Sequence, residues 1–432
     1  MVKINISPAL EKELKDLYGE ESFRIANPAY PGKGKKIRKT KDVSLCGKLK
    51  DEISQYVGKT ANKISTPILQ KFLEHHFVDK GEVSERRIEI YLFRKDPDQI
   101  IRTFWNIVAD RWTSALNKNP KQLAYYARKL CEMNSIQRFD LREDDRPSYN
   151  NQTAIPLMKE LDSFVRVYTV NKGTKWKVKF QFHDELYGKQ TGALTILKKI
   201  FDYRKKMKDE LRHKLMSKMS ISACPYCNRQ YITNYKTANG EKPLADLDHY
   251  YCKSRYPFLA LSIYNFVPGC QICNSRFKKD IDFYIDPHVN PHKRGFSTDA
   301  TFVLKDLNLL LDDSAWNDHS KLAIKLNVAG PDADIINRSI QTFHLNEVYE
   351  SHTDYVREII WKSKAYSPEM IKCVRDEFGM LFSSEDEIKE LIFGQYLRET
   401  DAGKRPLAKL TQDLLGKADN WNWPVASQNS KD

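Results

Sequence analysis

The sequence predicts a mostly α-helical protein with a small α+β insert. Apolar side chains recur every three or four residues around Trp105 and Trp112, as they do on the buried face of an amphipathic helix. Ser384 followed by Glu387 forms a capping box, which is typical of the start of another helix. Near the middle of the chain, short alternating stretches lie between two Cys-x-x-Cys pairs, and this change of pattern predicts a small insert that contains strands.

The predicted organisation has three regions. Residues 1–215 are expected to form a mainly helical N-terminal region with a β-hairpin near 164–182, where an Asn-Lys-Gly-Thr turn precedes apolar residues that alternate with polar ones from Trp176 to Phe182. Residues 216–300 contain the insert with its cysteines. Residues 301–432 are expected to form a helical C-terminal region, in which the capping box begins one helix.

Two segments of the N-terminal region need separate interpretation. Residues 84–93 fit a strand, because Ile88, Ile90 and Leu92 alternate, and equally fit a helix that Ser84 caps. Residues 191–220 predict one basic helix that leads directly into the first cysteine pair. The basic face of this helix is interpreted either as a guide for phosphate groups or as an ordinary solvated surface.

The charge of the chain favours a polyanionic partner. The 432 residues have a formal net charge of +14, and nucleic acid is the usual partner of such a protein, although a basic protein without that partner stays an alternative. The N-terminal residues lack the apolar segment of a secretory signal, and no apolar run approaches the length of a membrane span. We therefore expect a cytoplasmic protein that has no membrane partner.

The two cysteine pairs predict a structural zinc site. Cys224 and Cys227 form the first Cys-x-x-Cys pair, and Cys270 and Cys273 form the second. Zinc binds four thiolates tetrahedrally, and in a reducing compartment this spacing favours a metal over disulfides. Because 42 residues separate Cys227 from Cys270, the zinc would close a loop long enough to have its own structure. Two unrelated reduced pairs or a redox pair are the alternatives.

Between the cysteine pairs, Asp248 and His249 suggest hydrolytic chemistry. Residues 244–251 alternate like a short strand, on which neighbouring residues face opposite sides, so a bend or bulge would be needed for both to reach one site. Histidine is suited to activating water, and a carboxylate is a hard ligand for Mg²⁺. Asn274, directly after Cys273, offers a second oxygen ligand, or is simply a helix cap.

Two further residues stay open as ligands of that ion. Asp246 either joins Asp248 as a ligand or is a solvent-facing carboxylate on the strand. His288 either completes the metal shell or is an ordinary histidine in a proline-containing loop.

Together these motifs resemble the HNH endonucleases, the ββα-metal or His-Me finger nucleases, of the type that carries a four-cysteine zinc. The acidic residue before histidine matches Asp248 and His249, the middle asparagine matches Asn265, and the final Cys-x-x-Cys-Asn followed by a basic residue matches Asn274 and Lys278. The resemblance covers about 60 to 70 of the 432 residues. Where many relatives have proline, in His-x-x-Pro-Lys-Ser, this chain has Cys252.

The resemblance implies a role for each matched residue. His249 would be the general base, and Asp248 with Asn274 would bind one catalytic Mg²⁺ or Mn²⁺. Asn265 would tie the loop between hairpin and helix through backbone hydrogen bonds. Lys278, or alternatively Arg276, would contact the scissile phosphate.

The resemblance also implies a biological setting. Many HNH proteins with such a zinc belong to bacterial anti-phage defence, as in Septu-like systems, where the nuclease acts beside an ATPase. DNA is the expected substrate, with an ATPase partner protein or self-association through the helical flanks. The alternatives are a zinc-stabilised nucleic-acid-binding module without activity and an RNA-cleaving toxin that uses the same site.

Overall fold

The structure is a computed structural model that describes residues 1–20, 23–24, 42–57, 67–104, 107, 191–219, 221–237, 240–308 and 318–418. Helices predominate in it, and the sheets among the described residues have two strands each, so the prediction of a mostly helical protein with a small α+β insert is confirmed. The hairpin expected near 164–182 and the helix expected around Trp112 lie outside the described residues.

Within the described ranges, the α-helices before the first cysteine pair are α1 (Pro8–Glu20), α2 (Leu45–Ser54), α3 (Pro67–Phe77), α4 (Glu85–Leu92), α9 (Thr191–Ile200), α10 (Tyr203–Lys206) and α11 (Asp209–Met219). Those after the insert are α13 (Ala333–Thr342), α14 (Leu345–Tyr349), α15 (Thr353–Ala365), α16 (Pro368–Glu377), α17 (Glu385–Phe393) and α18 (Ala408–Ala418).

Each two-stranded sheet is an antiparallel pair. The pairs are β1 (Phe23–Arg24) with β2 (Asp42–Val43), β3 (Val78–Asp79) with β4 (Glu82–Val83), β5 (Asn234–Thr237) with β6 (Gly240–Pro243), β7 (Asp246–His249) with β8 (Phe266–Gly269), and β9 (Ala300–Leu304) with β10 (Ile324–Val328).

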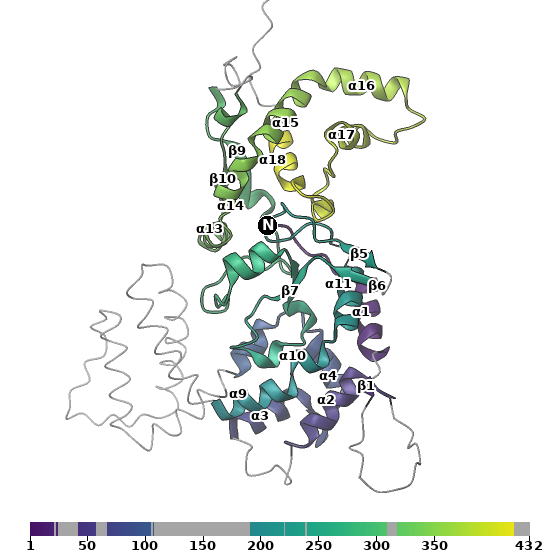
Figure 1. Cartoon of the computed structure of the whole chain (residues 1–432), viewed down its shortest axis with the longest axis vertical. Helices are drawn as coiled ribbons and strands as arrows, with labels where there is room; N and C mark the ends of the chain where they lie inside the picture. The colour runs from purple at the N-terminus through teal and green to yellow at the C-terminus, as the bar shows by residue number, and fades with distance from the viewer. Residues whose placement is uncertain are drawn as a thin grey trace, which may run out of the picture.

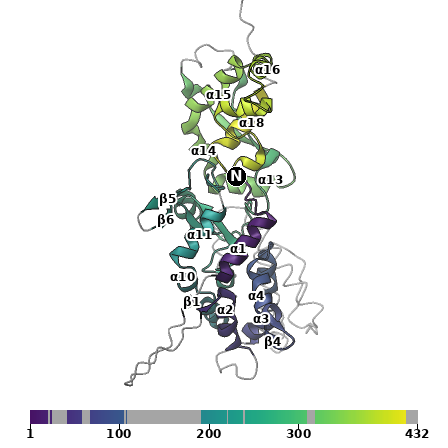
Figure 2. The same cartoon turned by 90° about the vertical axis from the view of Figure 1, so that its right-hand side faces the viewer.

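Many of the described helices lie in two groups at opposite ends of an elongated molecule. Figure 1 shows α2, α3, α4 and α9 at one end, α15 to α18 at the other, and β7 between them. The turned view of Figure 2 likewise shows α2, α3 and α4 at one end and α15, α16 and α18 at the other. One continuous hydrophobic core nevertheless runs from Leu14 in α1 to Leu414 in α18, so the insert is packed from both sides.

Contacts from both groups fix the insert. From the N-terminal side, the Tyr18 hydroxyl donates to the carbonyl oxygen of Leu261 at 3.1 Å, and the Tyr91 hydroxyl donates to that of Phe258 at 3.0 Å. From the C-terminal side, the Tyr349 hydroxyl donates to the carbonyl oxygen of Cys227 at 2.8 Å. All three hydrogen bonds are buried, so breaking any of them would leave a polar group unsatisfied and would lower the free energy of unfolding.

The structure gives the conformation of the two N-terminal segments, 84–93 and 191–220, that were interpreted separately from the sequence. Residues 85–92 are helical, and Ser84 occupies the N-cap position, although its side chain makes no capping hydrogen bond. The single helix expected over 191–220 is wrong, because the segment is divided into α9, α10 and α11. The Asp202 side chain accepts a hydrogen bond from the backbone N–H of Lys205 and so starts a new helix, and Met207 leaves helical geometry with ψ near 73°.

The C-terminal region is also less uniform than expected. It contains the hairpin of β9 and β10 before its helices begin. The capping box is confirmed in part: the Ser384 side chain accepts from the backbone N–H of Glu387 at 3.3 Å, while the Glu387 carboxylate accepts from Ser383 rather than from Ser384.

Candidate metal centre and adjoining site

The insert has the order strand, strand, helix. β7 pairs with β8 so that Asp248 lies opposite Val267 and His249 opposite Phe266, and the π-helix η4 (Ile272–Lys278) follows. The strand expected over 244–251 is therefore confirmed in its central part, where every position of β7 has a partner in β8 and no bulge interrupts the ladder. As a result, neighbouring side chains on β7 point to opposite faces.

All four cysteines of the two pairs meet at one buried point. The sulfur atoms of Cys224, Cys227, Cys270 and Cys273 lie within 4.8 Å of one another, and those of Cys227 and Cys270 are 4.0 Å apart. Tetrahedral zinc with zinc–sulfur bonds of about 2.3 Å would place its sulfur ligands about 3.8 Å apart. The cluster is thus positioned to bind a structural Zn²⁺, as the spacing predicted.

The chemistry around the sulfurs fits such an ion. Backbone N–H groups of Arg229, Cys270 and Cys273 donate to cluster sulfurs at 3.4, 3.3 and 3.5 Å, which favours thiolates. Hydrogen bonding from Cys224 lowers the pKa of Cys227, whereas burial raises the pKa of Cys224. Thiols so close together cannot all ionise without a cation, and a divalent ion would remove that conflict.

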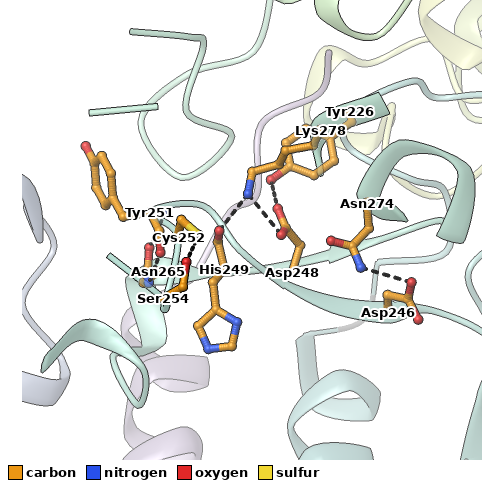
Figure 3. Close-up of polar contacts among 10 residues, drawn as sticks. All are labelled: Tyr226, Asp246, Asp248, His249, Tyr251, Cys252, Ser254, Asn265, Asn274 and Lys278. Carbon is orange, nitrogen blue, oxygen red and sulfur yellow. Dashed lines mark hydrogen bonds and ion pairs between the residues drawn. The ribbon is translucent and has the colours of Figure 1, made fainter. Parts of the chain in front are cut away.

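Asp248 is held on both of its carboxylate oxygens (Figure 3). The hydroxyl of Tyr226, which lies inside the first cysteine pair, donates to Oδ2 at 2.6 Å, and the Lys278 ammonium lies 3.1 Å from Oδ1. Lys278 also donates to the carbonyl oxygen of His249 at 2.8 Å. The Lys278 side chain is 1% exposed and that of Asp248 is 5% exposed, so this ion pair is buried.

Asn274 faces the same side of β7 as Asp248. Its side-chain Nδ2 donates to Oδ2 of Asp246 at 3.0 Å, so Asp246 and Asn274 are neighbours. Asp246 and Asp248 are two residues apart on one strand and therefore share a face. The sequence kept Asp246 open as a ligand, and the structure places it beside Asn274 with its oxygens on the face from which Asp248 projects.

His249 points away from these oxygens. Figure 3 shows its ring leaving β7 in the direction opposite to the Asp248 side chain. The ring is buried against Tyr203 and Phe266, with centroids 4.7 and 5.1 Å away. Its Nε2 lies 3.1 Å from the carbonyl oxygen of Ala260. A carbonyl oxygen can only accept, so Nε2 carries the hydrogen, and the neutral ring keeps its lone pair on Nδ1.

Burial also sets the protonation of His249. Removal from water lowers the pKa of His249 to about 3, and the positive charge of Lys253 acts in the same direction. At neutral pH the ring is therefore uncharged, which is the form that can accept a proton.

Asn265 closes the loop between the two strands. Its Oδ1 accepts from the backbone N–H of Tyr251 at 2.7 Å, and its Nδ2 donates to the carbonyl oxygens of Tyr251 and Leu259 at 3.1 and 3.2 Å. Its side chain is buried. These contacts have the form that the family resemblance implied for this asparagine. In the same loop, Sγ of Cys252 lies 2.9 Å from the hydroxyl of Ser254.

The other residues expected at the site, Lys278, Arg276 and His288, differ in exposure and in the partners they contact. Lys278 is buried in its ion pair, whereas Arg276, the alternative phosphate contact, is exposed on the same helix. His288 does not join the oxygens, because its Nδ1 lies 2.6 Å from the carbonyl oxygen of Asp286 and its Nε2 lies 2.8 Å from the Thr342 hydroxyl.

Sequence reasoning missed Tyr226 as a partner of Asp248. Tyr226 stands between the cysteines of the first pair, so the sequence predicts that it lies beside the metal centre. The sequence does not predict the direction in which its hydroxyl points. Its ring stacks on Phe343 of the C-terminal region with centroids 4.6 Å apart and an interplanar angle of 17°. A residue that follows the zinc cluster so closely can transmit the position of the cluster to Asp248.

Comparison of the sequence with protein-family models, with curated proteins and with solved structures found no match. In the part of the chain that the structure describes, none of the helices combines the length and apolar character that crossing a membrane requires.

Proposed function

We propose that this protein is a metal-dependent endonuclease of the HNH type that hydrolyses phosphodiester bonds in DNA. The observation that carries the proposal is the placement of oxygen ligands beside the four-cysteine cluster: Asp248 and Asn274 face one side, from a strand and from the helix that begins at the second cysteine pair. Hard oxygen ligands of this kind suit Mg²⁺ or Mn²⁺.

In this proposal His249 is the general base. The hydrogen bond to Ala260 fixes the tautomer with a lone pair on Nδ1, which is the acceptor that a base needs. A pKa of about 3 makes the His249 ring a weak base, so it can deprotonate only a water molecule whose own pKa has been lowered. A divalent ion on Asp248 and Asn274 would lower the pKa of water in that way. Because His249 and Asp248 leave β7 on opposite faces and the His249 ring is buried, the ring would have to turn toward Asp248 when substrate binds.

Charge and family resemblance supply the rest of the proposal. The net charge of +14 favours DNA as the substrate, and exposed Arg276 on η4 is better placed than buried Lys278 to contact a phosphate. By resemblance the nuclease would act in the bacterial cytoplasm in anti-phage defence, where an ATPase could be its partner.

The test compares two buried histidines of the same region. His292, like His249, places Nε2 near a backbone carbonyl, that of Phe266 at 2.6 Å, and burial lowers its pKa to about 4. Purified protein would be incubated with plasmid DNA and, separately, with RNA in the presence of Mg²⁺ or Mn²⁺. We expect His249→Ala to reduce cleavage at least about 100-fold, as loss of a general base does, while His292→Ala keeps its activity.

Several outcomes would count against the proposal. Equal cleavage by the wild type and by His249→Ala would remove His249 as the base. Cleavage of RNA alone would favour the toxin, and an inactive wild type with full zinc content would favour the binding module. Zinc analysis of each variant separates loss of chemistry from loss of fold.

One observation favours the second candidate, a zinc-stabilised nucleic-acid-binding module without activity. The Lys278 ammonium already neutralises Asp248 inside the protein, as a structural ion pair would. Lys278→Met distinguishes the two candidates. If Asp248 binds a catalytic ion, removal of the competing ammonium should lower the Mg²⁺ concentration that gives half-maximal cleavage.

A further inference from the structure

The C-terminal helices carry an unusual share of the exposed apolar surface. Thirteen large apolar side chains are exposed among the described residues, and seven of them lie between residues 361 and 391. Such a concentration marks an interaction surface more often than chance exposure does. The seven are Trp361, Tyr366, Met370, Phe378, Met380, Leu381 and Leu391.

Three of these residues form the turn between α16 and α17. Phe378, Met380 and Leu381 are 51%, 101% and 74% exposed, so they stand on the surface and contribute little to the core. Figure 1 shows α16 and α17 extending away from the rest of the molecule, with this turn at their outer end. We call residues 378–381 the apolar tip.

The surroundings of the tip are acidic in an otherwise basic protein. Residues 368–393 contain seven Asp or Glu against three Lys or Arg, whereas the whole chain has a net charge of +14. Asp376 and Glu377 stand directly before the tip, and Glu385 follows it closely. The Arg375 guanidinium lies 3.5 Å from Asp376 and 2.8 Å from Glu385, so Glu377 is the carboxylate beside the tip on which the charge argument depends. The tip therefore suits an apolar site that also presents basic residues, because opposite charges favour contact and like charges oppose it.

The same group of helices contains a site of that kind. A groove of about 630 Å³ runs between α15, α16, α17 and α18. Its wall combines apolar side chains with two lysines and one carboxylate, that of Asp386. The apolar and basic residues that matter for the argument are Tyr366, Ile371, Phe393, Leu415, Lys364 and Lys389.

We propose that a second copy of this chain occupies the groove, with the apolar tip of each protomer inserted into the groove of the other. Tip and groove are complementary in polarity and in charge. They lie on the same helices of one chain, so two copies can exchange tips around a two-fold axis and close the assembly. The inference goes beyond the nuclease proposal and does not depend on it.

The first experiment measures self-association of the full chain by sedimentation at increasing concentration. Met380→Glu would bury a charge in the apolar part of the groove, and we expect the dimer dissociation constant to rise at least about 30-fold, as on loss of a binding hot spot. Leu244→Glu is the matched control, because Leu244 is also exposed, at 59%, and belongs to the insert. This control should leave association unchanged.

A second experiment tests the identity of the occupant by exchanging charges. Glu377→Lys alone and Lys389→Glu alone should each weaken the dimer, and the double variant should recover it, because the attraction is restored with reversed signs. A wild type that stays monomeric at all concentrations would overturn the proposal. So would a dimer that Met380→Glu does not weaken, a failure of the double variant to recover, or binding of the tip to a different protein alone.

Discussion

Two asparagines occupy the same place in their motifs and have different roles. Asn228 and Asn274 each follow the second cysteine of a Cys-x-x-Cys pair. Asn228 adopts a positive φ of 51° and is 1% exposed, and its Nδ2 donates to the carbonyl oxygen of Ala402 at 2.8 Å. Asn274 is half-buried on η4 beside Asp246. The motif alone cannot separate them, because the partners of Asn228 lie more than 170 residues away.

Tyr226 connects the first cysteine pair to Asp248. Tyr226→Phe removes the hydroxyl that donates to Asp248 Oδ2 at 2.6 Å and leaves that buried oxygen without this donor. We expect a loss of about 1.5–3 kcal/mol in stability, typical of a hydrogen bond to a charged group, with zinc content unchanged. Thermal unfolding and zinc analysis check this. A variant as stable as the wild type would show that the bond contributes little.

Local sequence patterns predicted those helices and strands whose formation depends on neighbouring residues. Alternation predicted the strand that became β7, and the capping box predicted the start of α17 at Ser384. The breaks among α9, α10 and α11 were missed because apolar spacing continues across them, although the capping of Lys205 by Asp202 is a local signal for the start of a new helix. β9 and β10 were missed because each alternates over only five residues, within a region that otherwise predicts helices.

The zinc cluster should behave as a structural element. We expect one zinc per chain, and Cys273→Ser should lose the metal and lower the melting temperature, because the binding free energy of the ion contributes to folding. Cys373→Ser is the matched control, since Cys373 is exposed and stands outside the cluster. Metal analysis by mass spectrometry with thermal unfolding would decide. A wild type free of zinc after purification from zinc-containing medium would contradict the assignment.

The candidate site was predicted in part from the sequence, because its motifs are local whereas its packing is not. The residue types and their order indicated the cysteine cluster and the loop contacts of Asn265. Strand alternation indicated that Asp248 and His249 would face opposite sides, but the sequence left a bend or bulge open. That His249 leaves β7 on the face opposite to Asp248 depends on a ladder without a bulge, and the pairing of Lys278 with Asp248 depends on how η4 packs. Both depend on tertiary packing rather than on the motif.

For the whole molecule, buried histidines predict a dependence of stability on pH. Burial lowers the pKa of His76 to about 3 and those of His288 and His292 to about 4. Below a pH of about 6.5 the unfolded chain takes up protons at these rings, while the folded protein does not until pH 3 or 4. The free energy of unfolding should therefore fall with decreasing pH, by about 1.4 kcal/mol per pH unit for each ring.

His76 allows this effect to be measured away from the metal centre, since it lies on α3. The variant His76→Leu should show a shallower loss of stability between pH 6.5 and 5 than the wild type, whatever its stability at pH 7. Chemical unfolding at several pH values would give both slopes. Parallel curves for the two proteins would mean that His76 is protonated equally in the folded and unfolded states.

The link between Asn228 and the last helices has a consequence for how the chain is made. Asn228 donates to Ala402, and its side-chain Oδ1 accepts a hydrogen bond from the backbone N–H of Lys409 at 2.9 Å. Its backbone carbonyl oxygen accepts from the backbone N–H of Leu407 at 2.6 Å. These donors and acceptors emerge from the ribosome long after the first cysteine pair. A nascent chain therefore reaches residue 300 with the buried amide of Asn228 still open to water. The contacts that bury the Asn228 amide can therefore form only after residues 402–409 have been made.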